Sequence, residues 1–275
     1  MPQFAAGIEI EKVLDAIARR SHGARMAIAI LAPFERDRMR RAGRAAAATL
    51  AYVGARLAPG MTTAEIDRLV RAHTDQLGGR PSQLGYQGFP AAVCVSRNDI
   101  VCHGVPSRHV RLADGDIVNI DVTTELDGYH GDTSATFVIG DAAPHARSLV
   151  ELARGARDAG IAAAVPGARL GDIGAAIARH VGAAGSIVEA YGGHGIGRAM
   201  HMDPHVSHVG RAHTGHRLRE GMAFTVEPMI NAGAAAIRTD ADGWTIRTAD
   251  GALSAQFEHT VLIGPHGPEI TTVLA

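Results

Sequence analysis

The sequence has only two cysteines, Cys94 and Cys102, which form neither a CxxC pair nor a disulfide framework. Two small core residues in a reducing cytoplasm are the favoured interpretation. The 27 Lys and Arg residues nearly equal the 28 Asp and Glu residues, so no net field recruits nucleic acid or an anionic membrane. No hydrophobic run approaches the roughly eighteen residues that a membrane helix needs. A hydrophobic content of 46% predicts instead a globular protein with a sizeable core.

The N-terminus also lacks the basic start and apolar core of a signal peptide. Hydrophobic residues at helical spacing from Ile10 to Ile17 predict a short amphipathic helix there.

Two pairs of segments repeat along the chain at nearly one spacing. "PGMTTAEI" at 59–66 matches "PGARLGDI" at 166–173, an offset of 107 residues. "LADGDIVNID" at 112–121 matches "LREGMAFTVE" at 218–227, an offset of 106 residues. Two matches in the same order argue for internal duplication.

Both copies of the "PG" segment follow a helical stretch, the first at about 34–57 and the second at about 145–164. In the first copy, "TTAE" from Thr62 to Glu65 matches a capping box, which opens another helix. The strand-like runs are bounded by turns, and we expect them to be half-buried. We therefore predict an α+β fold with two similar halves, each helix–helix–strands, related by a pseudo-two-fold. The sheet is expected to be antiparallel and covered by helices.

A predicted hairpin brings two acids together. Asp127 and Gly128 form a two-residue turn signal, which pairs residues whose numbers add up to 255. Asp132 then faces Thr123, and Asp121 lies two residues along on the same face. Such diagonal positions are about 7–8 Å apart, so both carboxylates can reach toward one point.

The second half offers Glu227 in "MAFTVEPMI" and Glu258 in "LSAQFEHTVLI". If the halves meet at a pseudo-two-fold, all four acids converge. Two like charges ~4 Å apart repel by about 4 kcal/mol at an effective dielectric near 20, so such acids protonate or bind cations. Four carboxylates balance two divalent ions. The alternative is four ordinary surface acids on strands.

The glycine-rich stretch "YGGHGIGRAMHMDPHV" holds two histidines of interest among the 15 in the chain. His103 and His201 are each followed shortly by proline and precede the first acid of their half, so they resemble counterparts. His194 has no counterpart and is the candidate metal ligand. An extended chain would point His194 and His201 to opposite faces, so a bend is needed for one to bind metal and the other substrate. A lone buried histidine is more often structural. Oxygen ligands with one imidazole favour Mn, Fe or Co over a structural zinc.

Together these residues resemble the type I methionine aminopeptidases, over about residues 26–275. The matching stretches are "YQGFPAAVCVSRNDIVCHGVP", "DGDIVNIDVTTELDGYHGDTSATFVIG", "GGHGIGRAMHMDP", "GMAFTVEPMINAG", "DGWTIRT" and "SAQFEHTVLI". The resemblance implies the duplicated pita-bread fold. It also implies a dinuclear metallo-exopeptidase that removes the initiator methionine from nascent proteins when the second residue is small.

The resemblance implies specific roles for residues of this chain. The implied metal ligands are Asp121, Asp132, His194, Glu227 and Glu258. Asp132 and Glu258 would bridge two divalent ions, with Co, Mn or Fe as first candidates and Ni or Zn as further ones. His103 and His201 would bind substrate and, with Glu227, form the catalytic set. The implied pocket for the methionine side chain comprises Tyr86, Phe89, Cys94, Met200 and Trp244.

Three features depart from the family pattern. Met200 stands where close relatives usually carry Phe, Gln87 stands where many carry His, and "HMDP" replaces the frequent "HEEP". They bear on the shape of the pocket, not on the reaction. The resemblance divides the chain into a catalytic domain at 26–275 and a segment at 1–25 that is either an N-terminal extension or a misread start.

The expected partners are the N-termini of nascent polypeptides, with the ribosome as a further candidate, and the expected setting is the cytoplasm. No membrane or direct nucleic-acid binding is expected, and the short members of this family are usually monomers. Two alternatives remain, an Xaa-Pro aminopeptidase and a non-catalytic binding protein of the same fold. Non-catalytic proteins of this fold typically lose metal ligands and gain basic segments. Here all five implied ligands are present and the net charge is −1.

Overall fold

The computed structural model describes residues 28–274, so the predicted N-terminal helix and extension lie outside the described residues. None of the helices described is long and apolar enough to cross a membrane. The helices are α2 (Pro33–Gly54), α3 (Thr63–Gln76), the short 3-10 helix η1 (Tyr86–Gly88), α4 (Pro144–Ala163) and α5 (Leu170–Val181). The strands are β1 (Arg80–Pro81), β2 (Cys94–Arg97), β3 (Ile100–Cys102), β4 (Ile117–Leu126), β5 (Tyr129–Val138), β6 (Ser186–Ile187), β7 (Gly193–Gly195), β8 (Met202–Val206), β9 (Ala223–Val226), β10 (Met229–Asn231), β11 (Ile237–Thr239), β12 (Ile246–Thr248), β13 (Ser254–Gln256), β14 (Glu258–Ile263) and β15 (Pro268–Ile270).

Local sequence signals account for where the helices begin. The predicted capping box opens α3, because Thr62 Oγ1 accepts the Glu65 N–H at 3.2 Å and Glu65 Oε2 accepts the Thr62 N–H at 2.7 Å. Pro33 and Pro144 occupy first-turn positions of α2 and α4, where a missing N–H costs nothing. The predicted helix at 34–57 is confirmed as α2, although α2 ends three residues earlier, at Gly54.

The main sheet follows the order β1-β4-β5-β14-β9-β7-β8, with antiparallel pairing throughout. The predicted hairpin is confirmed as β4–β5. Asp127 and Gly128 have φ values of 53° and 78°, as a two-residue turn with positive φ at both positions requires. Thr123 pairs with Asp132, so the predicted register is correct.

The two halves share their local architecture. The Gly60 N–H donates to the Leu112 carbonyl at 2.7 Å, and the Gly167 N–H donates to the Leu218 carbonyl at 2.9 Å. An isolated β-bridge lies beside each of these contacts. The repeated "PG" segments therefore lead into α3 and α5 in the same way, as the sequence repeat predicts.

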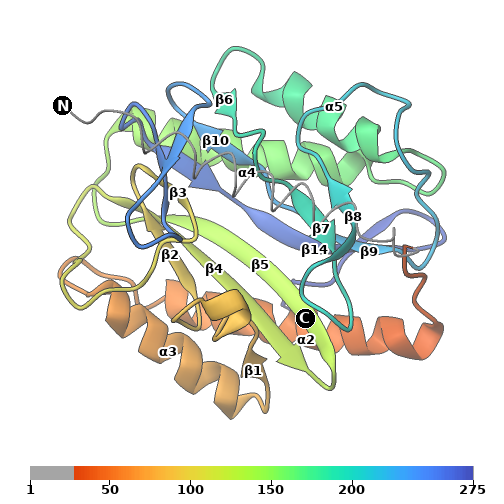
Figure 1. The fold of residues 1–275 in the computed structure, drawn as a ribbon, viewed down its shortest axis with the longest axis horizontal. Helices are drawn as coiled ribbons and strands as arrows, with labels where there is room; N and C mark the ends of the chain where they lie inside the picture. Colours follow the sequence, from red (N-terminus) through yellow and green to blue (C-terminus); the bar gives the residue numbers. More distant parts are fainter. Residues whose placement is uncertain (1–27, 275) are drawn as a thin grey trace, which may run out of the picture.

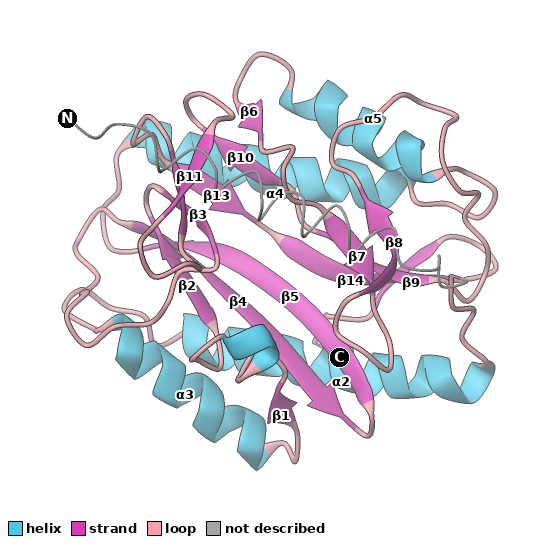
Figure 2. Cartoon of the chain, in the orientation of Figure 1, coloured by secondary structure: helices cyan, strands magenta, loops and turns pink. Residues whose placement is uncertain are grey.

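The helices lie against the sheet in two pairs, α2 and α3 beside β4 and β5, and α4 and α5 beside the C-terminal strands (Figures 1 and 2). Buried hydrophobic clusters fill the space beneath each pair. The prediction of half-buried strands is wrong, because all four residues of β9 and most of β4 are buried. Helices pack against one face of these strands, and the residues of the other face are mostly buried as well.

Candidate active site

Four adjacent strands each supply one acid. Asp121 lies in β4, Asp132 in β5 and Glu258 at the start of β14, while Glu227 directly follows β9. The sheet order places these four strands side by side. Three of the acids are buried, and Asp121 is partly buried. The sheet therefore brings the four predicted carboxylates to one region.

His194 completes this group from β7, which pairs with β9. Its Nε2 lies 3.6 Å from Glu227 Oε1 and 3.8 Å from Asp132 Oδ2. The ligand atoms of Asp132, His194 and Glu258 all lie within 4.8 Å of one another, a spacing at which one metal ion can be held. Asp121 lies close enough to raise the pKa of each of the other three acids through charge repulsion.

Removal from water dominates the electrostatics of the group. It raises the pKa of Asp121 to about 7 and that of Glu227 to about 8. Burial, followed by the charges of neighbouring acids, raises the pKa of Asp132 and Glu258 well above the usual range. Burial also lowers the pKa of His194 to about 3, so its imidazole is neutral at pH 7.

This donor set fits divalent cations. Within residues 28–274 none of these carboxylates forms an ion pair with Lys or Arg, and the nearby His194 imidazole is uncharged at pH 7. Buried acids without a counter-charge are costly unless protonated or bound to a cation. Four carboxylates and one neutral imidazole form an oxygen-rich set of the kind that suits Mn, Fe or Co.

Hydrogen bonds orient three of the acids, through residues that the sequence analysis missed. Thr123 Oγ1 donates to Asp132 Oδ1 at 2.8 Å. Thr225 Oγ1 donates to Glu227 Oε1 at 2.6 Å, and Gln83 Nε2 donates to Asp121 Oδ1 at 3.1 Å.

A sequence signal existed for the two threonines. Each lies two residues from a candidate acid on the same strand and so shares its face of the sheet. Gln83 lies in a loop that offers no such signal.

Of the two histidines predicted to bind substrate, His201 lies against His194, and His103 lies near His201. The chain bends as predicted, because β7 and β8 pair with each other, and the rings of His194 and His201 have centroids 4.2 Å apart. His201 Nδ1 lies 2.8 Å from the Tyr86 hydroxyl. Partial desolvation and the nearby His103 lower the pKa of His201. Burial lowers the pKa of His103 to about 4, and its ring packs edge-on against Tyr191 at 5.4 Å.

Most of the predicted pocket residues form one apolar cluster. Phe89 and Cys94 are buried there, and the Phe89 and Trp244 rings pack edge-on with centroids 5.2 Å apart. Cys94 pairs with Asp121 across β2 and β4, so this cluster adjoins the acids. Tyr86 lies outside this cluster and contacts His201 instead.

Met200 and Gln87, the two single residues that depart from the family pattern, differ in exposure. Met200 is buried and precedes His201 in the chain, whereas Gln87 is exposed, with a φ of 49°.

Burial raises the pKa of the Cys94 thiol well above its usual range, so the thiol packs as a neutral group.

A sequence model of metallopeptidase family M24 matches residues 37–265. The chain belongs to metallopeptidase family M24. Among its M24 relatives, "Methionine aminopeptidase A" of Synechocystis is 46% identical over 248 residues, which are 90% of this chain and 98% of the relative. The predicted resemblance to methionine aminopeptidases is thereby confirmed.

Solved structures agree with this M24 assignment. The methionine aminopeptidase from Rickettsia prowazekii has a TM-score of 0.88 and 44% identity, and the match covers 90% of this chain and all of that one. The prolidase from Pyrococcus furiosus has a TM-score of 0.73 at 20% identity, covering 97% of this chain and 68% of that one. The second match bears on the fold alone. The predicted α+β pita-bread fold is confirmed.

Proposed function

We propose that this M24 protein removes the N-terminal methionine from nascent proteins whose second residue is small. The observation that carries the proposal is the convergence of Asp132, Glu227 and Glu258 on the neutral imidazole of His194. Asp121 lies beside these acids on the adjacent strand β4. Relatives named methionine aminopeptidase, 44–46% identical over 90% of this chain, support the same activity.

Five residues would hold two divalent metal ions in this reaction. The proposed ligands are Asp121, Asp132, His194, Glu227 and Glu258, and the ligand atoms of Asp132, His194 and Glu258 lie within 4.8 Å of one another. Co, Mn and Fe are the first candidates, with Ni and Zn as further ones. When bound, such ions supply Lewis acidity and lower the pKa of water.

The protein's own side chains would then position substrate and move protons. Glu227 is the proposed general base and then acid, held in place by its hydrogen bond from Thr225. His201 would steady the developing oxyanion with an Nε2–H in the tautomer whose Nδ1 accepts the Tyr86 hydroxyl proton. His103, neutral at pH 7 because burial lowers its pKa, would contact the nitrogen of the scissile bond.

The methionine side chain would enter the apolar cluster around Phe89, Cys94 and Trp244, and Tyr86 and Met200 are the further proposed pocket residues. Such a pocket selects by shape. Norleucine should be rejected poorly, because a difference of methylene size is worth only ~1–3 kcal/mol.

Domain, setting and partners follow from the same proposal. We infer that residues 26–275 form the catalytic domain and that the protein acts as a monomer in the cytoplasm. Its substrates would be the N-termini of nascent polypeptides, which emerge at the ribosome.

One experiment tests the activity and the metals together. Metal-stripped protein receives Mn, Fe or Co in turn, and the release of free amino acid is measured from Met-Ala-Ser and from Ala-Pro-Ala. We expect methionine release that depends on added metal. Cleavage of Ala-Pro-Ala alone would indicate an Xaa-Pro aminopeptidase, and release of neither amino acid would favour a non-catalytic protein.

A further inference from the structure

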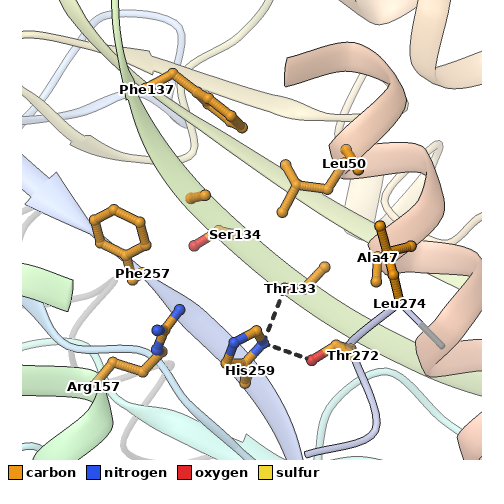
Figure 3. Close-up of a pocket in the computed structure, with 12 residues that line it drawn as sticks. Ala47, Leu50, Thr133, Ser134, Phe137, Arg157, Phe257, His259, Thr272 and Leu274 are labelled. Carbon is orange, nitrogen blue, oxygen red and sulfur yellow. Dashed lines mark hydrogen bonds between the residues drawn. The ribbon is translucent and has the colours of Figure 1, made fainter. Parts of the chain in front are cut away.

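A second pocket, of about 260 Å³, lies beside Arg157 and His259 (Figure 3). Its floor is formed by β5 and β14, and α2 and α4 supply walls. Side chains alternate between the faces of a strand. Asp132 and Glu258 point to the active-site face, so the next residues, Thr133 and His259, line this second pocket.

The lining is mostly apolar, and its polar side chains are three hydroxyl groups, one imidazole and one guanidinium. Leu50, Phe137, Phe257 and Leu274 are its large apolar residues. Arg157 is the one charged side chain among the described lining residues, and no carboxylate lines the pocket in this part of the chain. Such a lining is complementary to a molecule with an apolar body and a negative end.

Arg157 is held in place but has spare donors. Its side chain is only 11% exposed, and its guanidinium lies 5.4 Å from the centre of the Phe257 ring. Its Nε and Nη2 both donate to Asp158 Oδ1, at 2.9 and 2.7 Å. A guanidinium has five N–H donors, so Nη1 is free to bind an oxyanion as far as the described residues show.

His259 supplies a second donor. The Thr133 hydroxyl donates to the Glu258 carbonyl at 2.9 Å, and the Thr272 hydroxyl accepts the Thr260 N–H at 3.2 Å. The Thr272 hydroxyl proton is then free to go to His259 Nδ1, which lies 2.8 Å away. When the Thr272 hydroxyl donates to Nδ1, the ring proton lies on Nε2, the nitrogen opposite these contacts.

We propose that this pocket binds a small amphipathic carboxylate of the fatty-acid type, with its carboxylate at Arg157 and His259 and its tail among Leu50, Phe137 and Leu274. The volume suits such a ligand. It exceeds the ~150 Å³ of a cavity that takes benzene and falls just below the ~300 Å³ at which pockets for drug-sized molecules begin.

Octanoate is the probe, titrated by calorimetry into the full chain, and octan-1-ol is its uncharged analogue. We expect saturable octanoate binding at millimolar concentrations or below and weaker binding of octanol. Arg157→Gln should weaken octanoate binding by about tenfold or more, because it removes a charge-assisted contact. The matched control is Arg154→Gln. Arg154 also lies over the Phe257 ring, at 5.0 Å, yet is 47% exposed and does not line the pocket.

Ala51→Leu provides an independent test, because Ala51 lines the pocket from α2 and leucine is a good helix former. It should abolish octanoate binding while the urea midpoint stays near that of the unchanged protein. The proposal is overturned if octanol binds as tightly as octanoate, if both arginine variants lose affinity equally, or if Ala51→Leu binds undiminished. Absence of saturable octanoate binding also overturns it.

Discussion

Thr225 forms hydrogen bonds with two of the proposed metal ligands, and its replacement by valine tests the proposed metal site most directly. Thr225 Oγ1 accepts the His194 N–H at 2.9 Å and donates to Glu227 Oε1 at 2.6 Å. The side chain is fully buried, so no water can replace the hydroxyl. Valine has nearly the same shape, and the packing in β9 is therefore preserved.

The expected loss follows from the two hydrogen bonds. Residues that hydrogen-bond to the metal ligands and orient them typically contribute 10–100-fold to metal affinity. That range corresponds to about 1.4–2.8 kcal/mol. The His194 N–H would in addition be buried without a partner, at a cost of about 1–3 kcal/mol to the folded state. Thr225→Val should therefore lower both metal affinity and the stability of the metal-free protein.

Competitive titration of Mn²⁺ against a chelating dye measures the affinity, and urea unfolding measures the stability. Thr225→Ser is the control, because it keeps the hydroxyl and loses only a methyl group. We expect its metal affinity to stay close to that of the unchanged protein. Equal affinity in Thr225→Val and the unchanged protein would refute the role given to this hydroxyl and weaken the case for His194 and Glu227 as ligands.

Three further predictions concern catalysis, pH and stability. His201→Ala should lower kcat strongly with little change in metal content, measured by peptide assay and elemental analysis. Asp121 and Glu227 have folded pKa values of about 7 and about 8, above the value of about 4 in an unfolded chain. The native state therefore binds their protons more tightly, and the urea midpoint of the metal-free protein should fall as pH rises from about 4 to about 8. Tyr129→Phe removes the 2.6 Å hydrogen bond to Glu35 and should reduce the free energy of unfolding by about 1–3 kcal/mol, measured with urea.

Each of these predictions has an outcome that contradicts it. Loss of metal in His201→Ala would mean that the division between ligand and substrate histidines is wrong. A stability of metal-free protein that is flat or rising over this pH range would mean that water reaches the acids. An unchanged midpoint in Tyr129→Phe, with Glu35→Gln as the companion variant, would mean that solvent replaces the bond.

The parts of the site that the sequence predicted are those set by local rules. Asp127 and Gly128 dictate the turn, the turn dictates the register of β4 and β5, and the register places Asp121 beside Asp132. The repeat extends this reasoning to the second half, because equivalent segments make equivalent contacts.

The parts that escaped prediction depend on long-range packing. His208 is one of 15 histidines and carries no pattern, yet it is buried and its Nε2 accepts the Glu227 N–H at 3.2 Å. Gln83 reaches Asp121 from a loop whose path depends on the finished sheet. Strand burial was underestimated for a related reason, since periodicity within a strand does not reveal what covers its second face.

The place of β14 in the sheet has a consequence for synthesis. This strand is among the last in the chain, yet it lies between β5 and β9 and joins the two halves. A growing chain whose synthesis has not passed Ile263 can form the β4–β5 hairpin but cannot close the ring of acids around His194. Metal capture is thus expected only after β14 has been synthesised, and a chain released before that point would carry two half-sites that bind metal weakly.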